Sequence, residues 1–389
     1  MKLCRVIVLT VAVCLLLCGC DMWMDGSYHS VTPHQEADSV LKDGTVEVSE
    51  YSQLYQAVCD MVADGIPNGV IYTSTISDKQ LKTYLNLVRS SVMTSDPIGA
   101  YAVNSVDWEV GTNAGRTAVA LTISYSHSRA DILRIKHVAS MDAVYEQIHQ
   151  ALISCEPNVA IMVEKYEAVD FVQKVQDFVE QNPQLCMEMP QVSPAVYPRG
   201  GDRRVVELVF GYQNSREDLR QMQDYVQPIF RAANLNVSAE EEETTKFSRM
   251  YAFLMERTDY QQETSLTPAY SLLRHGVGDS KAFAMVYSAM CREAGLTCMV
   301  VTGSRDGEPW SWNLICADGV YYHVDLLRSL SSGKLLRMTD AEMRGYVWDY
   351  DAFPAASPVQ QEQPAEDTVP DETVEEETLP PETVAPEGE

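Results

Sequence analysis

An internal repeat with a period of about ninety residues constrains the fold of this 389-residue chain more than any other feature. Three apolar residues recur with the same helical spacing: Leu81, Leu85 and Val88 in the first copy, and Phe171, Val175 and Phe178 in the second. Such spacing places three side chains on one face of a helix. A short apolar run precedes this helix in each copy, at residues 70–73 and 159–163, and another amphipathic helix precedes that run. The chain is therefore predicted to contain two similar modules.

Each module is predicted to end in a β-hairpin, which gives an αβαββ order for residues 46–138 and for residues 139–235. The clearest match between the copies follows the hairpins, where residues 125–132 and 212–219 share Tyr, Ser, Arg and Asp in step. Ser and Asp beside a helix start are typical of N-caps with ion-pair support. A ligand site repeated in both modules is the alternative interpretation.

Four short motifs follow the second module in a fixed order: residues 269–284, 291–296, 307–313 and 319–325. Their glycine and aromatic landmarks resemble the active-site segments of the transglutaminase-like superfamily, over residues 238–350. The resemblance implies a papain-like α+β domain, which we place at residues 236–352. The whole chain is thus predicted to be of the α/β (α+β) class. The residues Ser238-Ala239-Glu240-Glu241 read as a capping box that opens the first helix of this domain.

The resemblance also implies a catalytic Cys, His and Asp, but two of these positions are substituted here. Ser280 stands in the place of the cysteine, Trp310 in that of the histidine, and Asp325 in that of the aspartate. A serine nucleophile needs a general base, and an indole offers only an N–H donor. His275 and His323 are the nearby imidazoles in the sequence. The family position of His323 implies a structural role, while His275 is a candidate replacement base.

The sequence therefore predicts a degenerate site with no active catalytic residue, in a pseudoenzyme. Ser280 is interpreted as a helix N-cap, and Trp310 as a plug or an aromatic platform. Asp325 is expected to bond to backbone groups or to the indole of Trp310. The candidate ligand cleft comprises Ser280, Trp310, Trp312, Asp325 and His275.

By resemblance to relatives that handle peptides and proteins, the expected ligands of this cleft are peptide, protein or cell-wall segments. Two alternatives stay open. One is a Ser280-dependent amide or ester hydrolase or acyltransferase with an unconventional base. The other is an architectural scaffold for a surface protein complex. No motif for a metal or a cofactor is found, so none is predicted.

The amino terminus has the pattern of a bacterial lipoprotein signal. Lys2 and Arg5 precede an apolar run from Val6 to Leu17, and a small residue precedes Cys20. The pattern predicts a signal peptide over residues 1–19, removed by cleavage, and acylation of Cys20. Residues 20–45 then form a flexible tether. We expect a lipid-anchored protein on the extracytoplasmic face of a bacterial membrane.

The remaining cysteines and the charge distribution complete the analysis. Six cysteines follow Cys20 without any zinc-binding spacing, and buried free thiols are expected; Cys291 and Cys298 are the one pair that a disulfide would suit. The net charge is −27, and eleven of the acidic residues lie beyond residue 355, where no Lys or Arg is found. This composition predicts a disordered, Pro-rich acidic tail over residues 353–389. The acidic balance argues against nucleic acid as a partner.

Overall fold

A computed structural model describes residues 46–256 and 261–357 of the chain. These residues divide into two compact units: residues up to 134 together with 198–201, and residues 135–197 together with those from 202 onward. Their helices and mostly antiparallel sheets confirm the predicted mixed α+β class. The predicted signal peptide, Cys20, the tether and the tail beyond residue 357 lie outside the described residues.

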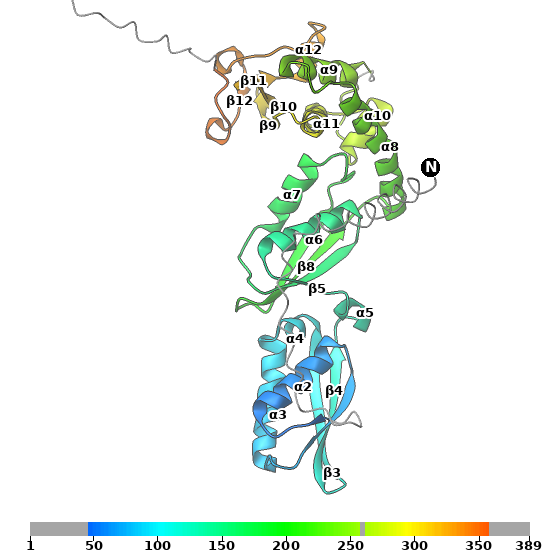
Figure 1. Ribbon diagram of the computed structural model, residues 1–389, viewed down its shortest axis with the longest axis vertical. Coiled ribbons are helices and arrows are strands. Elements are labelled where there is room, and N and C mark those ends of the chain that lie inside the picture. Colours follow the sequence, from blue (N-terminus) through cyan, green and yellow to red (C-terminus); the bar gives the residue numbers. More distant parts are fainter. Residues whose placement is uncertain (1–45, 257–260, 358–389) are drawn as a thin grey trace, which may run out of the picture. The chain divides into compact units, whose positions relative to one another are not determined.

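The first unit is a four-stranded sheet covered by helices on one face (Figure 1). The strand order is β1-β2-β4-β3, with β1 at Val46–Glu47, β2 at Asn68–Thr73, β3 at Val103–Asn113 and β4 at Arg116–Tyr125. The covering helices α2 (Tyr51–Ala63) and α3 (Asp78–Thr94) share one apolar core with the inner side chains of the sheet. The hairpin between β3 and β4 turns at Ala114 and Gly115, which both have positive φ, as a two-residue turn matching the strand twist requires.

The second sheet repeats the order and sense of the first. Its order is β5-β6-β8-β7, with β5 at Lys136–Val138, β6 at Asn158–Val163, β7 at Gln191–Tyr197 and β8 at Arg204–Gly211. The helices α6 (Met141–Ile153) and α7 (Phe171–Gln181) contribute to its core. In both sheets the first strand pairs parallel with the second, and the other pairings are antiparallel. Two similar modules are therefore present in the described chain, and their descent from a duplication stays a prediction.

The predicted αβαββ order is incomplete, because each module begins with a short parallel strand. The strand β5 belongs to the second sheet, so that sheet starts before the predicted boundary at residue 138. The short helix α4 (Pro97–Ala102), capped by Asp96, was also not predicted. In α7 the core side chains are Phe171, Val175 and Val179, and Phe178 is only half-buried.

The repeated Ser-Arg-x-Asp motif caps helices, as predicted. Ser128 and Asp131 form a capping box at α5 (Arg129–Ile132). At α8 (Arg216–Leu235), the Ser215 hydroxyl accepts from the Asp218 N–H at 3.1 Å and donates to its carboxylate at 2.6 Å. Each copy thus satisfies donors at its own helix start.

The arginine of the repeated motif has a second, equivalent role in both copies. Arg129 Nε donates to the carbonyl of Asp64 at 2.8 Å, and Arg216 Nε donates to the carbonyl of Ser154 at 3.0 Å. These carbonyls belong to the residues that end α2 and α6. The motif therefore joins the start of one helix to the end of another, which accounts for its repetition without a ligand.

In the carboxy-terminal part, one helix packs against a sheet of order β11-β10-β9-β12, and two further helices pack against that helix. The helices are α9 (Glu243–Met255), α10 (Pro268–His275) and α11 (Ser280–Glu293), and α12 (Leu326–Leu330) follows the strands. The strands are β9 (Cys298–Arg305), β10 (Glu308–Ala317), β11 (Val320–Val324) and β12 (Tyr346–Val347). Two short 3-10 turns, Asp340–Glu342 and Tyr350–Ala352, flank β12.

The predicted division at residue 236 does not separate two cores. Leu219, Val226, Phe230 and Ala233 of α8 lie in one apolar cluster with Phe247, Leu272 and Phe283 of the following helices. Helix α8 was assigned to the second module, yet its apolar face completes the core of the carboxy-terminal part. The second module and that part therefore form a single compact unit.

Two predicted boundaries are also wrong. Helix α9 begins at Glu243, and the Ser238 hydroxyl bonds with Glu240 in a preceding turn, so residues 238–241 do not cap this helix. The tail was predicted to begin at residue 353. Ala356 is nevertheless fully buried, and its backbone pairs with Asp340, because Phe353 and Ala356 complete the core around Trp348.

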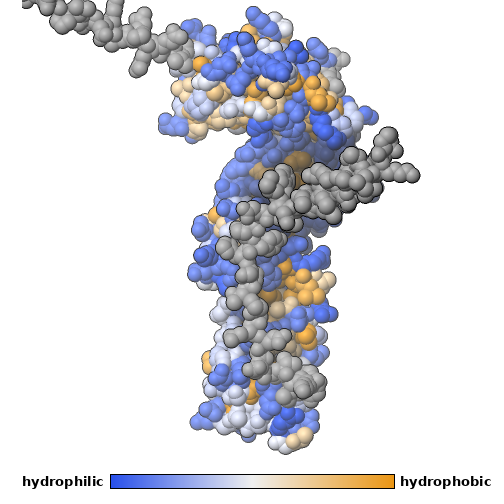
Figure 2. Space-filling model, viewed as in Figure 1, coloured by the Kyte–Doolittle hydropathy of each residue, from blue (hydrophilic) through white to orange (hydrophobic). Residues whose placement is uncertain are grey.

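None of the six cysteines in the described chain forms a disulfide, so Cys291 and Cys298 are unbridged. Among the described helices, none combines the length and the apolar content needed to cross a bilayer. Figure 2 shows hydrophilic residues over most of the drawn face, with apolar residues in small separate groups.

Candidate functional site

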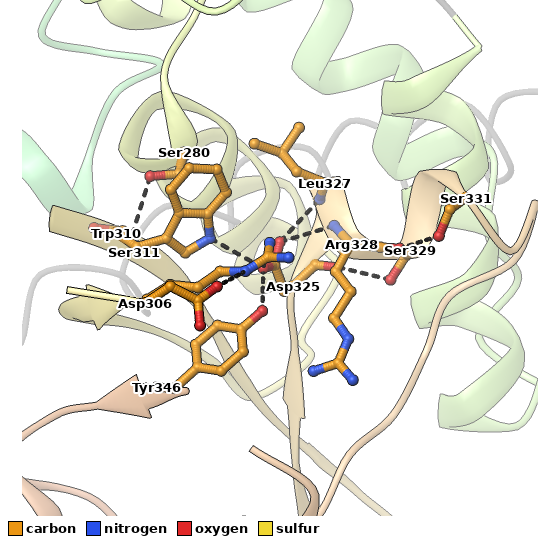
Figure 3. Close-up of polar contacts among 11 residues, drawn as sticks. Ser280, Asp306, Trp310, Ser311, Asp325, Leu327, Arg328, Ser329, Ser331 and Tyr346 are labelled. Carbon is orange, nitrogen blue, oxygen red and sulfur yellow. Dashed lines mark hydrogen bonds and ion pairs between the residues drawn. The ribbon is translucent and has the colours of Figure 1, made fainter. Parts of the chain in front are cut away.

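Ser280 is the first residue of α11 and is not its cap, which corrects the prediction. The N-cap is Asp279, whose carboxylate accepts from the Ala282 N–H at 2.8 Å. Gly276, with φ of 70°, ends the preceding helix α10 in the left-handed conformation and allows the chain to turn toward α11. The buried Ser280 hydroxyl accepts from the backbone N–H of Ser311 on β10 at 3.1 Å (Figure 3).

Asp325 is a buried carboxylate, 1% exposed, that accepts five hydrogen bonds. One oxygen caps α12 by accepting from the backbone N–H groups of Leu327 and Arg328. The other oxygen accepts from side chains at 3.0, 2.6 and 3.2 Å, namely the Trp310 indole, the Tyr346 hydroxyl and the Arg305 guanidinium. Burial, followed by the bond to Asp325, raises the pKa of Tyr346. The predicted bond between Trp310 and Asp325 is confirmed.

Ser280 shares a small cavity with one carboxylate, that of Asp325, which already accepts five hydrogen bonds. The small cavity beside its hydroxyl has no volume that a water molecule can enter. Its walls come from α11, β10 and the start of α12, and include Phe283, Ala284, Asn313 and Leu326. No histidine is among the lining residues of this cavity, and the indole of Trp310 points its donor at Asp325.

His323 is buried in the core, and both of its ring nitrogens have partners there. The Trp312 indole donates to His323 Nδ1 at 2.9 Å, so the proton of the neutral ring lies on Nε2, which contacts Asp340 at 2.8 Å. Burial lowers the pKa of His323, while the Asp340 carboxylate acts in the opposite direction. Both ring nitrogens are therefore occupied, and His323 has a structural role.

His275 does not line the cavity at Ser280. It is exposed at the end of α10, where its ring packs edge-on against Tyr270 with centroids 5.6 Å apart. The hypothesis that His275 replaces the catalytic base has no support in this arrangement.

The structure brings only part of the predicted ligand cleft together. Ser280, Trp312 and Asp325 line one small cavity, whereas Trp310 bonds to Asp325 and His275 is not among the lining residues (Figure 3). Trp312 is 1% exposed, and its ring packs in the core against Tyr346 and Trp348. The predicted cleft is closed, because the core side chains around Ser280 leave no room for a water molecule. Trp310 itself is half-buried, and the guanidinium of Arg305 lies 5.4 Å from its ring centroid.

Sequence reasoning missed Arg305 and Tyr346, which complete the bonding of Asp325. Neither residue falls in a family motif. Tyr346 lies on β12, a two-residue strand that pairs with β9 only through the tertiary fold. No signal in the sequence connects it to the site. Within the described ranges, no group of three or more His, Cys, Asp or Glu residues is placed to hold a metal ion.

Comparison with known proteins agrees with this architecture. Residues 231–326 match the family described as the Transglutaminase-like superfamily. This part of the chain is therefore a transglutaminase-like domain, as the motifs predicted. A search of curated proteins found no match.

Solved structures give only distant similarities. A structure titled as that of a TGase is 10% identical with a TM-score of 0.24, and the match covers 49% of this chain and 58% of the other. A candidate cysteine protease from Cytophaga hutchinsonii is 13% identical with a TM-score of 0.24, covering 41% and 70%. A candidate protease from Parabacteroides distasonis ATCC 8503 is 10% identical with a TM-score of 0.22, covering 66% and 40%. The chain thus spans little more than half the length of the first of these.

Proposed function

We propose that this transglutaminase-like domain is catalytically inactive and binds peptide, protein or cell-wall segments without turnover. We further propose that the chain is a lipoprotein, acylated at Cys20 and held on the extracytoplasmic face of a bacterial membrane. The lipobox-like pattern before Cys20 supports the second proposal.

The hydrogen bond between Trp310 and Asp325 carries the proposal of inactivity. In the chemistry that the family motif implies, the carboxylate orients an imidazole that accepts a proton from the nucleophile. Here the indole donates to the carboxylate and has no lone pair with which to accept a proton. Ser280 has lost the partner that an alcohol needs to become a nucleophile.

A serine-directed probe tests the inactivity directly. We expect a fluorophosphonate to label the wild type no more than the Ser280→Ala variant, even after prolonged incubation. Ser288→Ala is a matched control, because Ser288 is also a buried serine of α11. Labelling of the wild type that disappears only in Ser280→Ala would support the alternative, a Ser280-dependent hydrolase.

Ser280, Trp310, Asp325 and Arg305 are called the degenerate centre below. The exposed part of this centre supports a binding role. The half-buried ring of Trp310 and the guanidinium of Arg305, whose side chain is about one third exposed, form a stacked pair at the surface. An aromatic face beside a guanidinium suits the backbone and the side chains of an extended peptide.

Binding can be measured with soluble cell-wall fragments and with extended peptides. We expect saturable binding that Trp310→Ala weakens by about tenfold, which corresponds to the loss of an aromatic anchor. Trp108→Ala is the matched control, since Trp108 stacks with Arg89 in a similar way at 5.0 Å but lies in the other unit. An equal effect of both substitutions, or the absence of any saturable binding, would refute a ligand at this centre.

A further inference from the structure

A cavity of about 390 Å³ lies on a different side of α11 from Ser280. One wall comes from the end of α7 and the segment after it, with Val179, Pro183, Cys186, Met187 and Met189. The opposite wall comes from Leu266, Pro268, Ala269, Ala282 and Met285. No residue that lines the small cavity at Ser280 also lines this one. It is therefore a second, separate site candidate, and its volume falls in the range usual for ligand pockets.

The two walls are fixed to each other by direct contacts. Lys281 Nζ lies 2.7 Å from Glu180 Oε1, which joins the start of α11 to α7. The guanidinium of Arg292 donates to the carbonyl of Gln181 at the end of α7. Met187 and Ala269, which belong to opposite walls, also lie in one apolar cluster. The cavity is thus a fixed part of the second compact unit.

The interior of the cavity suits an apolar group. Its lining is mainly aliphatic and includes Met187, Met189 and Met285, whose unbranched thioethers adapt to irregular apolar shapes. At the entrance, Leu266 is 55% exposed and Met189 is 39% exposed. Large apolar side chains exposed beside a concave apolar surface mark a place that a partner can cover.

The charged groups that line the cavity favour a cationic partner. Glu180 and Asp279 contribute two carboxylates, and Lys281 contributes one ammonium, which is already paired with Glu180. The Asp279 carboxylate caps α11 and also accepts from the Thr264 hydroxyl at 3.0 Å. The net charge of the chain, −27, adds a long-range attraction for cations. The same charges repel the carboxylate of a fatty acid.

We propose that this cavity binds a peptide or protein segment that inserts a large apolar side chain and carries a basic residue next to it. This inference does not rest on the inactivity of the degenerate centre, because none of the side chains that carry it forms a hydrogen bond with the side chain of Asp325 or Ser280. It assigns a ligand class to a surface formed jointly by α7 and the transglutaminase-like domain.

Calorimetric titration of the full chain with the peptide acetyl-Phe-Leu-Lys-amide tests the proposal. We expect saturable binding, weakened about tenfold or more for the acidic twin acetyl-Phe-Leu-Glu-amide and for acetyl-Gly-Gly-Lys-amide. Absence of binding by the first peptide, or equal binding by all three, would overturn the proposal. Laurate is a fourth ligand, and tighter binding of laurate would assign the cavity to acyl chains instead.

Variants locate the binding. Leu266→Trp should obstruct the entrance of the cavity and abolish binding of acetyl-Phe-Leu-Lys-amide. Leu330→Trp, the same change at another exposed leucine of the same unit, should leave this binding unchanged. Glu180→Gln should reduce the ratio of the affinity for acetyl-Phe-Leu-Lys-amide to the affinity for acetyl-Phe-Leu-Glu-amide. Trp310→Ala should leave this binding unchanged. If Trp310→Ala abolishes it and Leu266→Trp does not, the ligand lies at the degenerate centre, and the present proposal fails while the earlier one stands.

Discussion

At the scale of single residues, Asp325 has kept the position that the family motif gives it and has become a structural residue. Its five hydrogen bonds hold α12, β9, β10 and β12 together. Both oxygens of the buried carboxylate accept hydrogen bonds, so replacing the carboxylate leaves donors without an adequate acceptor.

We predict that Asp325→Asn lowers the free energy of unfolding by about 3 kcal/mol, since the amide turns one acceptor into a donor that faces other donors. Urea denaturation measures this change. Glu308→Gln, an equivalent change at an exposed residue of β10, should have an effect near zero. Equal stability of the two variants would contradict the structural role of Asp325.

His323 predicts a pH dependence. Burial holds its folded pKa below the unfolded value of about 6.5, so the unfolded state binds more protons as the pH falls. Stability is therefore fully present above about pH 6.5 and declines as the pH drops toward the folded pKa. Burial also lowers the pKa values of His137 and His149, so the test compares the decline in stability of a His323 variant with that of the wild type. We expect His323→Gln to show a smaller decline than the wild type between about pH 7 and 5, and an unchanged decline would refute this role.

At the scale of elements, the sequence indicated the long amphipathic helices and the hairpins and missed the short pieces. Leu81 and Leu85 are buried on α3 as their spacing predicted. The strand β1 has two residues, too few to show an alternating pattern, and it forms by pairing with a strand more than twenty residues later. Ser238 has the composition of a cap, but the core contacts of Phe247 and Leu254 set where α9 begins.

The candidate site around Ser280 was predictable from the sequence to a similar extent as the helices and strands. The motif order placed Ser280, Trp310 and Asp325 together, and the indole–carboxylate bond followed from the donor and acceptor chemistry. The sequence left open whether the cleft is closed, because Trp310 could be a plug or a platform. The bonds of Tyr346 and Arg305 to Asp325 could not be predicted, because both residues reach it from elements outside the motifs. Likewise, the cavity beside α7 depends on how a neighbouring module packs, which no local pattern encodes.

The paired arginines of the two modules yield a prediction at this scale. We expect Arg129→Ala and Arg216→Ala each to destabilise by about 1–2 kcal/mol, because each removes a charged donor from a carbonyl at a helix end. Arg134→Ala is the control, as Arg134 is largely exposed and both of its contacts, the ion pair with Asp131 and the bond to the Ala130 carbonyl, lie within one local turn and join no second helix. Chemical denaturation measures the three variants. An Arg134→Ala effect as large as the other two would show that the shared contact is unimportant.

At the scale of the whole molecule, the described chain has two compact units, and the second joins a module to the transglutaminase-like domain through one apolar cluster. We predict that Phe230→Ala, on α8, destabilises the whole second unit by about 3–5 kcal/mol and leaves the first unit unchanged. Hydrogen exchange resolved along the chain measures both units. Faster exchange confined to residues after 236 would show that the second module is independent.

No histidine lines the cavity at position 280, and the most direct test of what this implies is the alkylation rate of a thiol placed there. In Ser280→Cys, the tryptic peptide 275–281 contains the new cysteine, and mass spectrometry of this peptide measures the rate of its alkylation by iodoacetamide at each pH. We expect a rate equal to or below that of an ordinary thiol, rising only near pH 8.5. The double change Ser280→Cys with Trp310→His restores an imidazole beside Asp325 and should shift that rise to lower pH. A reactive thiolate below pH 7 in the single variant would contradict the account.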